Sequence, residues 1–244
     1  MVFGANGGLG MALVREFLQR EWQVVAFGRR MTRDRFLAQL GLADIGIRSQ
    51  HLLYRRVPDI SRTRIDALVR SCDLPLHQHR TYVNAVGRCF YAPFLSASTK
   101  DFQRMIQSNL GVTFNILRHV CRVARRVPTT SFLYVEIGSR AGADVSHARF
   151  SLYAMVKQGQ LGLLRALASE LRETRCTLTV VTVPGVRTRL YDRSLGDRTA
   201  LRHKFEHGSD LLLPAHVAEA ITERIERWID TERESAGPFE HWTL

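Results

Sequence analysis

The sequence lacks the features that mark membrane-spanning, secreted or zinc-binding proteins. Its 244 residues contain no run of about 18 apolar residues, so we expect no transmembrane helix and no membrane partner. The opening segment has no basic stretch followed by a long apolar one, so no secretory signal is expected. Cysteine is scarce, and Cys72, Cys89, Cys121 and Cys176 form no C-x-x-C pair. This spacing predicts no metal site and indicates reduced thiols in a cytoplasmic protein.

Lysine is also rare. Only Lys100, Lys157 and Lys204 occur, and all the other basic residues among the 35 are arginines. Against 23 acidic residues they give a formal net charge of +12. Such a charge favours an anionic partner, which can be nucleic acid, an acidic protein, a membrane surface or a phosphorylated ligand. The charge alone does not distinguish among these four classes.

Composition and periodicity predict one folded α/β domain over residues 1–244. The chain is 45% hydrophobic and 24% charged, which is typical of a protein with a sizeable core. Strand patterns lie at Met1–Phe3, Gln23–Phe27, His51–Tyr54, Thr81–Ala85, Phe132–Ile137 and Leu178–Val183. Helical patterns lie at Leu9–Arg20, Asp34–Leu40, Arg62–Cys72, Lys100–Arg126, Ser151–Glu173 and Ala215–Trp228. This alternation predicts a doubly wound parallel sheet with helices on both faces. The polar, irregular residues 187–212 are expected to form a substrate lid.

Three glycines follow the first strand pattern directly. Gly4, Gly8 and Gly10 lie in Gly-Ala-Asn-Gly-Gly-Leu-Gly, immediately before a helical pattern. Glycine lets the backbone turn tightly and lets a pyrophosphate approach without a Cβ in the way. The free N–H groups at the start of the next helix then favour phosphate. A glycine cluster alone is weak evidence, but this position between strand and helix predicts a dinucleotide site.

Two arginines follow the second strand pattern. In dinucleotide-binding folds, an acid at this position binds a free ribose 2′-hydroxyl, whereas an arginine accommodates a 2′-phosphate. Here Arg29 and Arg30 follow Gly28 and no acid is present. The pair therefore predicts NADP(H) as the cofactor, with an ordinary solvated loop as the alternative.

Tyr153 and Lys157 lie one helical turn apart at the start of a helical pattern. Residues at i and i+4 share a helix face, so the ammonium group is expected beside the phenol. A nearby positive charge favours phenolate, so we expect Lys157 to lower the pKa of Tyr153. Such a phenol can act as a general acid or base near neutral pH. The alternative is a surface pair without chemistry.

Together these features resemble the short-chain dehydrogenase/reductase family, which has a Rossmann-type fold, and the resemblance covers essentially the whole chain. The residues matching its cofactor motifs are, in chain order, Gly4, Asn6, Gly8, Leu9, Gly10, Asp59, Ile60, Asn84, Ala85, Gly87, Pro184, Gly185, Val186 and Thr188. They match the G-x-x-x-G-x-G turn, the aspartate after the third strand, the N-N-A-G motif and, one residue short, the P-G-x-x-x-T turn. The C-terminal segment lacks the family's usual ending, which leaves a last strand undecided.

The resemblance also assigns a catalytic tetrad of Asn109, Ser139, Tyr153 and Lys157. It implies that NADPH delivers hydride to a carbonyl carbon while Tyr153 protonates the oxygen. Ser139 would donate a hydrogen bond to that oxygen. Lys157 would bind the nicotinamide ribose, and Asn109 would hold a water that relays protons through Lys157.

The substrate is not defined by the sequence. The chain is similar to NADPH-dependent ketoreductases, so we expect a small-molecule ketone or secondary alcohol. The alternative is a β-ketoacyl or polyketide group on an acidic acyl carrier protein, which Arg125, Arg126, Arg175 and the basic lid would contact.

A remote alternative is a non-catalytic protein that senses NADP or binds RNA, but the arginines are dispersed, so no nucleic-acid partner is expected. The family pairs two helices across a dyad, which implies a homodimer or homotetramer. Leu161, Leu164 and Ala168 fit either that helix face or a core stripe.

Overall fold

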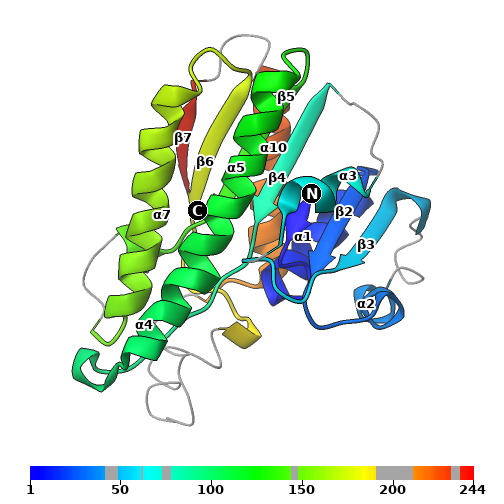
Figure 1. Cartoon of the computed structure of the whole chain (residues 1–244). Coiled ribbons are helices and arrows are strands. Elements are labelled where there is room, and N and C mark those ends of the chain that lie inside the picture. The colour runs from blue at the N-terminus through cyan, green and yellow to red at the C-terminus, as the bar shows by residue number, and fades with distance from the viewer. Residues whose placement is uncertain (42–48, 62, 73–77, 144–147, 191–210, 232–236) are drawn as a thin grey trace.

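The computed structural model describes residues 1–41, 49–61, 63–72, 78–143, 148–190, 211–231 and 237–244. A seven-stranded sheet runs through the middle of this part of the chain, in the order β3-β2-β1-β4-β5-β6-β7 (Figure 1). Its strands are β1 (Val2–Phe3), β2 (Val24–Gly28), β3 (Leu52–Arg56), β4 (His79–Asn84), β5 (Ser131–Ile137), β6 (Cys176–Thr182) and β7 (Phe239–Thr243). Every neighbouring pair is parallel, and the order reverses at β1, which confirms the predicted doubly wound sheet.

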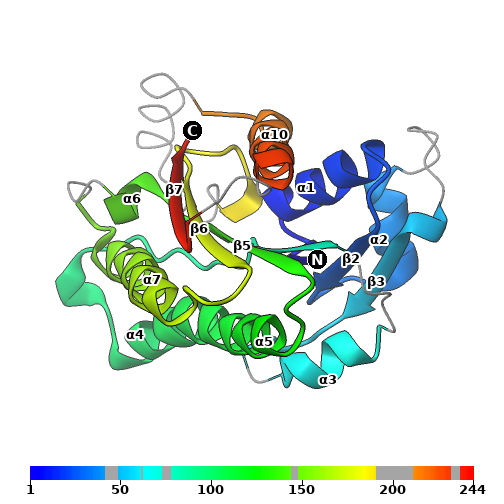
Figure 2. The same ribbon diagram turned by 90° about the horizontal axis from the view of Figure 1, so that it is seen from above.

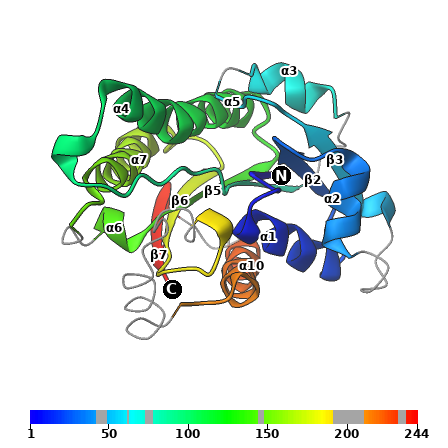
Figure 3. The ribbon, with the colours of Figure 1, turned by 90° about the horizontal axis from the view of Figure 1, so that it is seen from below.

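Helices cover both faces of the sheet, as Figures 2 and 3 show from opposite sides. One face carries α1 (Gly8–Gln19), α2 (Arg33–Leu40) and α10 (Pro214–Thr231). The other carries α3 (Ile65–Arg70), α5 (Val112–Arg126) and α7 (Ser151–Glu170). The shorter α4 (Thr99–Met105) precedes α5, and α6 (Arg140–Ala143) precedes α7. Within the described ranges, no helix is long and apolar enough to cross a bilayer.

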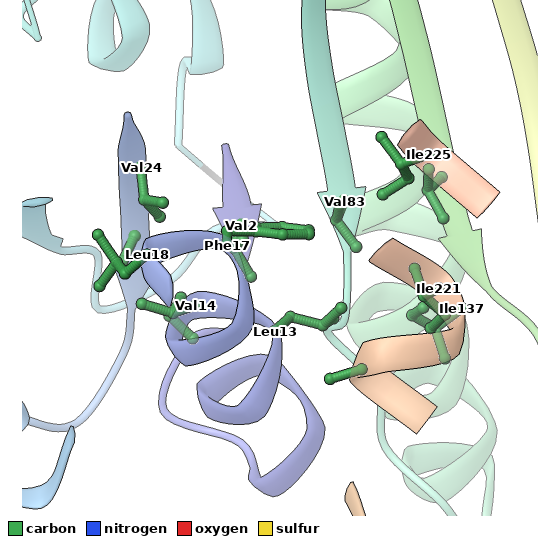
Figure 4. Packing of buried hydrophobic residues seen from close by; sticks show 14 of the residues in the cluster. Val2, Leu13, Val14, Phe17, Leu18, Val24, Val83, Ile137, Ile221 and Ile225 are labelled. Carbon is green, nitrogen blue, oxygen red and sulfur yellow. The ribbon is translucent and has the colours of Figure 1, made fainter. Parts of the chain in front are cut away.

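The strands alternate their side chains between two cores. In β5, Leu133 and Val135 pack toward α1 and α10, whereas Phe132 and Tyr134 pack toward α5 and α7. Figure 4 shows the first core, where Leu13 of α1 and residues of α10 meet the strand side chains. These buried apolar contacts hold the ends of β1, β4 and β5 in place, and the functional residues follow those ends.

The structure extends the prediction for the short first strand. Only Val2 and Phe3 form β1, yet both are fully buried between β2 and β4. The Met1 amino group donates to the Thr81 carbonyl oxygen at 2.7 Å, and the Met1 carbonyl accepts from Val83 N–H at 2.8 Å. Hydrogen bonds thus continue the ladder beyond the two strand residues.

Three other details differ from or go beyond the sequence expectations. The helix expected at 100–126 is interrupted by a π-helical turn at Ile106–Gly111. The undecided C-terminal segment forms β7, which pairs with β6. Leu161, Leu164 and Ala168 belong to the core under the sheet, so the core-stripe reading holds for them. Most of the expected lid, residues 191–210, lies outside the described residues.

Candidate active site

A cavity of about 780 Å³ opens where the strand order reverses, beyond the carboxyl ends of β1, β2, β4 and β5. In doubly wound sheets this position is where ligands bind. Its lining includes most of the residues singled out in the sequence: Gly4, Asn6, Gly8, Leu9, Gly10, Arg29, Arg30, Asp59, Ile60, Ala85, Gly87, Ser139, Tyr153, Lys157, Pro184, Gly185, Val186 and Thr188. Among the residues of the cofactor motifs and the tetrad, Asn84 and Asn109 are the two that do not line it; both side chains are fully buried beneath its wall.

The glycine turn forms one end of the cavity and leaves no space for side chains. Gly4 has a φ of +87°, and a Cβ there would lie 2.8 Å from the Ala85 carbonyl group. A Cβ on Gly10 would lie 2.3 Å from the Gly4 oxygen. Gly7 precedes α1 without a side-chain cap, so the first N–H groups of α1 have no side-chain acceptor at the cap. This turn fits a phosphate group.

Asn6 connects the turn to the second and third strands. Its Oδ1 accepts hydrogen bonds from the Tyr54 hydroxyl and the Arg30 N–H, both at 3.2 Å. Its Nδ2 is buried and finds no acceptor among the described residues. A buried donor without a partner is costly, and Asn6 lines the cavity, so this group fits a bound ligand that supplies an acceptor.

Positive charge gathers beside Asn6. Burial, the neighbouring Arg30 guanidinium and that of Arg88 all lower the pKa of Arg29, and only Asp59 opposes them. Arg29 therefore lies close to the positive charges of Arg30 and Arg88, and all three residues line the cavity. An anionic group bound between them would relieve that repulsion. The residues present thus fit a dinucleotide that carries an extra phosphate.

Ser139, Tyr153 and Lys157 meet at the other end of the cavity. Ser139 follows β5, and its side chain lies close enough to Tyr153 to lower the pKa of the phenol. The Lys157 ammonium donates to the Ile137 carbonyl oxygen at 2.7 Å and lies 5.9 Å from the centre of the Tyr153 ring. Two hydroxyl groups and one buried ammonium therefore converge on one wall.

The pKa of Tyr153 differs from the expectation that Lys157 lowers it. Burial raises the pKa of Tyr153 above its ordinary value of about 10, and Cys89 and Glu136 raise it further. Ser139 opposes this shift. The Lys157 ammonium donates to the Ile137 carbonyl oxygen, and Lys157 is not among the groups that shift the pKa of Tyr153. Burial also lowers the pKa of Lys157.

Asn109 lies in the π-helical turn. Its Nδ2 donates to the carbonyl oxygens of Arg88 and Met105 at 3.2 and 2.9 Å, and its Oδ1 accepts from Arg88 N–H at 3.1 Å. The side chain is thus engaged with the segment after β4, which lines the cavity. π-Helical turns are frequent at functional sites because they change which carbonyl groups are bonded within the helix.

Asn84 also forms a hydrogen bond with the backbone of the segment after β4. Its Oδ1 accepts from Val86 N–H at 3.1 Å, and its Nδ2 donates to both carboxylate oxygens of Glu136. No sequence motif pointed to Glu136. A single acid in the apolar strand Ser131–Ile137 was the signal that could have found it.

Arg88, Cys89, Arg104 and Arg140 also line the cavity, outside the motifs that the sequence resembles. Of these, only Arg104 was missed, because the sequence already indicates segments 88–94 and 140–150 as walls of the pocket. Thr188 was identified, and its side chain lies against the glycine turn, since a Cβ on Gly8 would approach Thr188 Cγ2 to 2.9 Å. In the part of the chain that the structure describes, no group of three or more His, Cys, Asp or Glu residues could hold a metal ion.

Comparison with known proteins places this geometry in a family. Serine 3-dehydrogenase of Agrobacterium fabrum (strain C58 / ATCC 33970) is 30% identical over 128 residues, which span 49% of this chain and 46% of that protein. The match therefore covers about half the length of that relative.

Solved structures share the whole fold. The closed form of serine dehydrogenase complexed with NADP+ superposes with a TM-score of 0.77 at 22% identity, over 100% of this chain and 92% of that one. The 3-ketoacyl-(acyl-carrier-protein) reductase from Brucella melitensis complexed with NADH gives 0.76 at 18% identity, over 100% and 94%. At these identities the likeness establishes the fold alone.

A model of the short chain dehydrogenase family matches residues 1–198, a stretch that contains the glycine turn, Ser139, Tyr153 and Lys157. The match spans most of the chain and agrees with the sheet order and the position of the cavity. The protein is a member of the short-chain dehydrogenase family of oxidoreductases.

Proposed function

We propose that this protein is an NADP(H)-dependent oxidoreductase that interconverts a ketone and a secondary alcohol. The observation that carries the proposal is that the glycine turn and the side chains of Ser139, Tyr153 and Lys157 all line the same cavity. A dinucleotide phosphate fits the turn, and the reacting carbonyl would lie against the hydroxyl groups. When bound, the nicotinamide supplies or accepts a hydride at the carbonyl carbon.

Tyr153 would donate a proton to the carbonyl oxygen during reduction. The hydroxyl is protonated at neutral pH and can therefore donate, while burial raises its pKa and makes it a weaker acid in the free protein. Ser139 lies within hydrogen-bonding reach of Tyr153 and would donate a second hydrogen bond to the same oxygen. Lys157 would hold the ribose hydroxyls of the cofactor and keep positive charge beside the phenol.

The preference for NADP(H) rests on Arg29 and Arg30. Both line the cavity next to Asn6, and the repulsion among Arg29, Arg30 and Arg88 favours a bound phosphate. The structural neighbours do not decide this point, because one is described with NADP+ and another with NADH.

A free carbonyl compound receives more support than a carrier-bound one. Arg125 and Arg126 end α5, and Arg175 precedes β6. All three therefore lie at the edge of the sheet where β5 and β6 begin, roughly seven strand residues or about 20 Å from the edge that Ser139 follows. None of the three lines the cavity, so they give the carrier-bound alternative no direct support at the site.

The proposal includes a homodimer or homotetramer in the cytoplasm. The outer face of α5 and α7 supports self-association, because it forms a groove lined by apolar residues and arginines: Phe114, Leu117, Arg118, Cys121, Arg122, Arg125, Arg126, Leu163 and Leu167. A non-catalytic sensor or an RNA-binding protein would not require a serine, a tyrosine and a lysine at one cavity wall.

The test is NADPH oxidation, followed by absorbance, with a panel of free ketones and β-ketoacyl thioesters, and the same panel with NADH. We expect turnover of at least one ketone and a higher kcat/KM with NADPH than with NADH. Absence of turnover across the panel with both cofactors would count against the enzyme function, and a preference for NADH would count against the cofactor assignment.

A further inference from the structure

Glu136 is a carboxylate in the hydrophobic core. It lies in β5, is 0% exposed and follows the alternation of that strand, so it shares the face of Phe132 and Tyr134 under α5 and α7. An apolar residue is expected at such a position. A buried carboxylate is strongly unfavourable unless donors and an opposite charge surround it.

Four donors from four elements surround this carboxylate. Asn84 Nδ2 of β4 lies 2.9 and 3.2 Å from its two oxygens, and Thr113 Oγ1 of α5 donates at 3.0 Å. Gln160 Nε2 of α7 donates at 2.9 Å, and the Tyr134 hydroxyl donates from β5 itself. Gln160 also donates to Thr113 at 2.7 Å, so the donors are linked to one another. Such a set suits an ionised carboxylate, which only accepts hydrogen bonds.

Three of the donors, and Glu136 itself, are each coupled to one part of the candidate active site. Asn84 accepts from Val86 N–H in the cavity-lining segment. Thr113 lies one helical turn after Asn109, and Gln160 lies about one turn after Lys157. Glu136 itself precedes Ile137, whose carbonyl oxygen accepts from the Lys157 ammonium at 2.7 Å.

We propose that Glu136 is a positioning residue of the reaction, whose buried carboxylate balances the charge of Lys157 and holds together the elements that carry Asn109, Ser139 and Lys157. This inference rests on the proposed function, because it assigns a role to a residue that supports the same site. It explains why a charge lies in a core position where an apolar residue would pack without cost.

The charges around Lys157 agree with this role. The titratable groups that interact with it or with Glu136 are Tyr153 of α7, Tyr134 of β5 and Cys89 after β4. Burial lowers the pKa of Lys157, whereas Glu136 raises it. Burial raises the pKa of Glu136, and Lys157 together with the hydrogen bonds from Tyr134, Asn84 and Thr113 opposes that shift. The two charged forms therefore support each other.

The test is the titration of Lys157 in the Glu136→Gln variant, which removes the charge and keeps the shape. Because the chain has only three lysines, ¹³Cε-lysine NMR gives three signals, and Lys157→Arg identifies the relevant one. We expect the Lys157 titration midpoint to fall by about one pH unit or more, because the negative charge that raises the pKa of Lys157 is removed. An unchanged midpoint would overturn the proposal.

A matched variant separates charge from structure. Gln160→Leu removes one donor and leaves the Glu136 charge, so it should lower the melting temperature while the Lys157 midpoint moves much less than in Glu136→Gln. Equal midpoint shifts in both variants would overturn the proposal. If Glu136→Gln does not fold, infrared spectroscopy of the wild-type protein decides: an ionised Glu136 at pH 7 supports the charge balance, and a protonated carboxyl band contradicts it.

Turnover gives an independent readout. Glu136 also raises the pKa of Tyr153, so the pH profile of kcat should move to lower pH in Glu136→Gln. A fall in kcat without a shift of the profile would mean a structural role alone and would overturn the proposal. Failure of the proposed function appears differently, as wild-type protein without turnover, and does not affect the Lys157 titration.

Discussion

Asn109 holds the backbone of Arg88 at both of its polar groups. Its Nδ2 donates to the Arg88 carbonyl oxygen at 3.2 Å, and its Oδ1 accepts from the Arg88 N–H at 3.1 Å. This two-point contact fixes the segment after β4, which lines the cavity, to the π-helical turn. The side chain is therefore a structural link between two walls of the site.

Replacement of this side chain should loosen the site. In Asn109→Ala the hydrogen bonds to Arg88 and Met105 are lost and buried backbone groups lose their partners, so we expect the free energy of unfolding to fall by about 2–3 kcal/mol. Cofactor affinity should fall as well. Urea denaturation and fluorescence titration with NADPH measure the two effects.

Gln103→Ala is the control for this substitution. Gln103 is exposed on the preceding helix and does not line the cavity, so its replacement should change stability by less than about 0.5 kcal/mol. Equal effects of the two substitutions would show that the Asn109 contacts do not stabilise the segment.

The general arrangement could be predicted from the sequence because it depends on repeated local patterns. The apolar runs at Gln23–Phe27 and Phe132–Ile137 and the helices between them determine a parallel sheet, and the glycine turn marks its reversal point. Tyr153 and Lys157 could be paired from their spacing alone.

The rest depends on contacts between distant segments. No local pattern shows that Asn84 and Asn109 turn into the protein instead of lining the cavity, or that Glu136 lies among four donors. The direction of the Tyr153 pKa shift was predicted wrongly, because spacing gives the proximity of Lys157 but not the desolvation of the phenol.

The close backbone packing of the glycine turn gives a second prediction. In Gly10→Ala, the added methyl group would lie 2.3 Å from the Gly4 carbonyl oxygen, so the turn must shift. We expect a loss of NADPH affinity of about 10-fold or more, equivalent to about 1.4 kcal/mol, and a lower melting temperature. Isothermal titration calorimetry and thermal unfolding measure these quantities.

Gly162→Ala is the matched control, since nothing lies within 4 Å of a Cβ placed there on α7. Alanine should stabilise that helix by roughly 0.5–1 kcal/mol and leave NADPH affinity unchanged. A Gly10→Ala protein that binds NADPH like the control would contradict the role of the turn.

Cofactor choice gives a third prediction. In the double variant Arg29→Ala and Arg30→Ala, two of the three clustered guanidinium groups are removed, so the KM for NADPH should rise about 10-fold or more while that for NADH changes little. Steady-state kinetics with both cofactors and one ketone provides the measurement. An unchanged ratio of the two kcat/KM values would refute the assignment of these arginines to a 2′-phosphate.

A buried histidine gives a fourth prediction, which concerns stability alone. His119 Nδ1 lies 2.7 Å from Asp66 Oδ1, and its Nε2 lies 3.3 Å from the Tyr82 hydroxyl. Burial, reinforced by Arg80 and Arg70, lowers the pKa of His119 from 6.5 to about 4. Between pH 6.5 and about pH 4, His119 therefore binds a proton in the unfolded chain but not in the folded chain. Stability is therefore complete above about pH 6.5 and falls as pH drops toward 4, by up to roughly 3 kcal/mol.

Urea denaturation at several pH values from 7 to 4.5 tests whether the free energy of unfolding falls as the pH decreases. In His119→Gln the fall in stability over this range should be smaller than in the wild-type protein, whereas His216→Gln, at an exposed position, should reproduce the wild-type fall. If His119→Gln and the wild-type protein lose the same free energy across this range, proton uptake by His119 is not the cause.

The central claim is that Tyr153 transfers the proton in a ketone–alcohol conversion. The direct measurement is single-turnover NADPH oxidation with a ketone that the wild-type enzyme reduces, repeated with Tyr153→Phe. Phenylalanine keeps the ring and removes the hydroxyl group that would transfer the proton. We predict a rate at least about 100-fold lower, as for the loss of a general acid, with an NADPH dissociation constant within about 3-fold of wild type. A Tyr153→Phe protein that reduces the ketone at the wild-type rate would contradict the account.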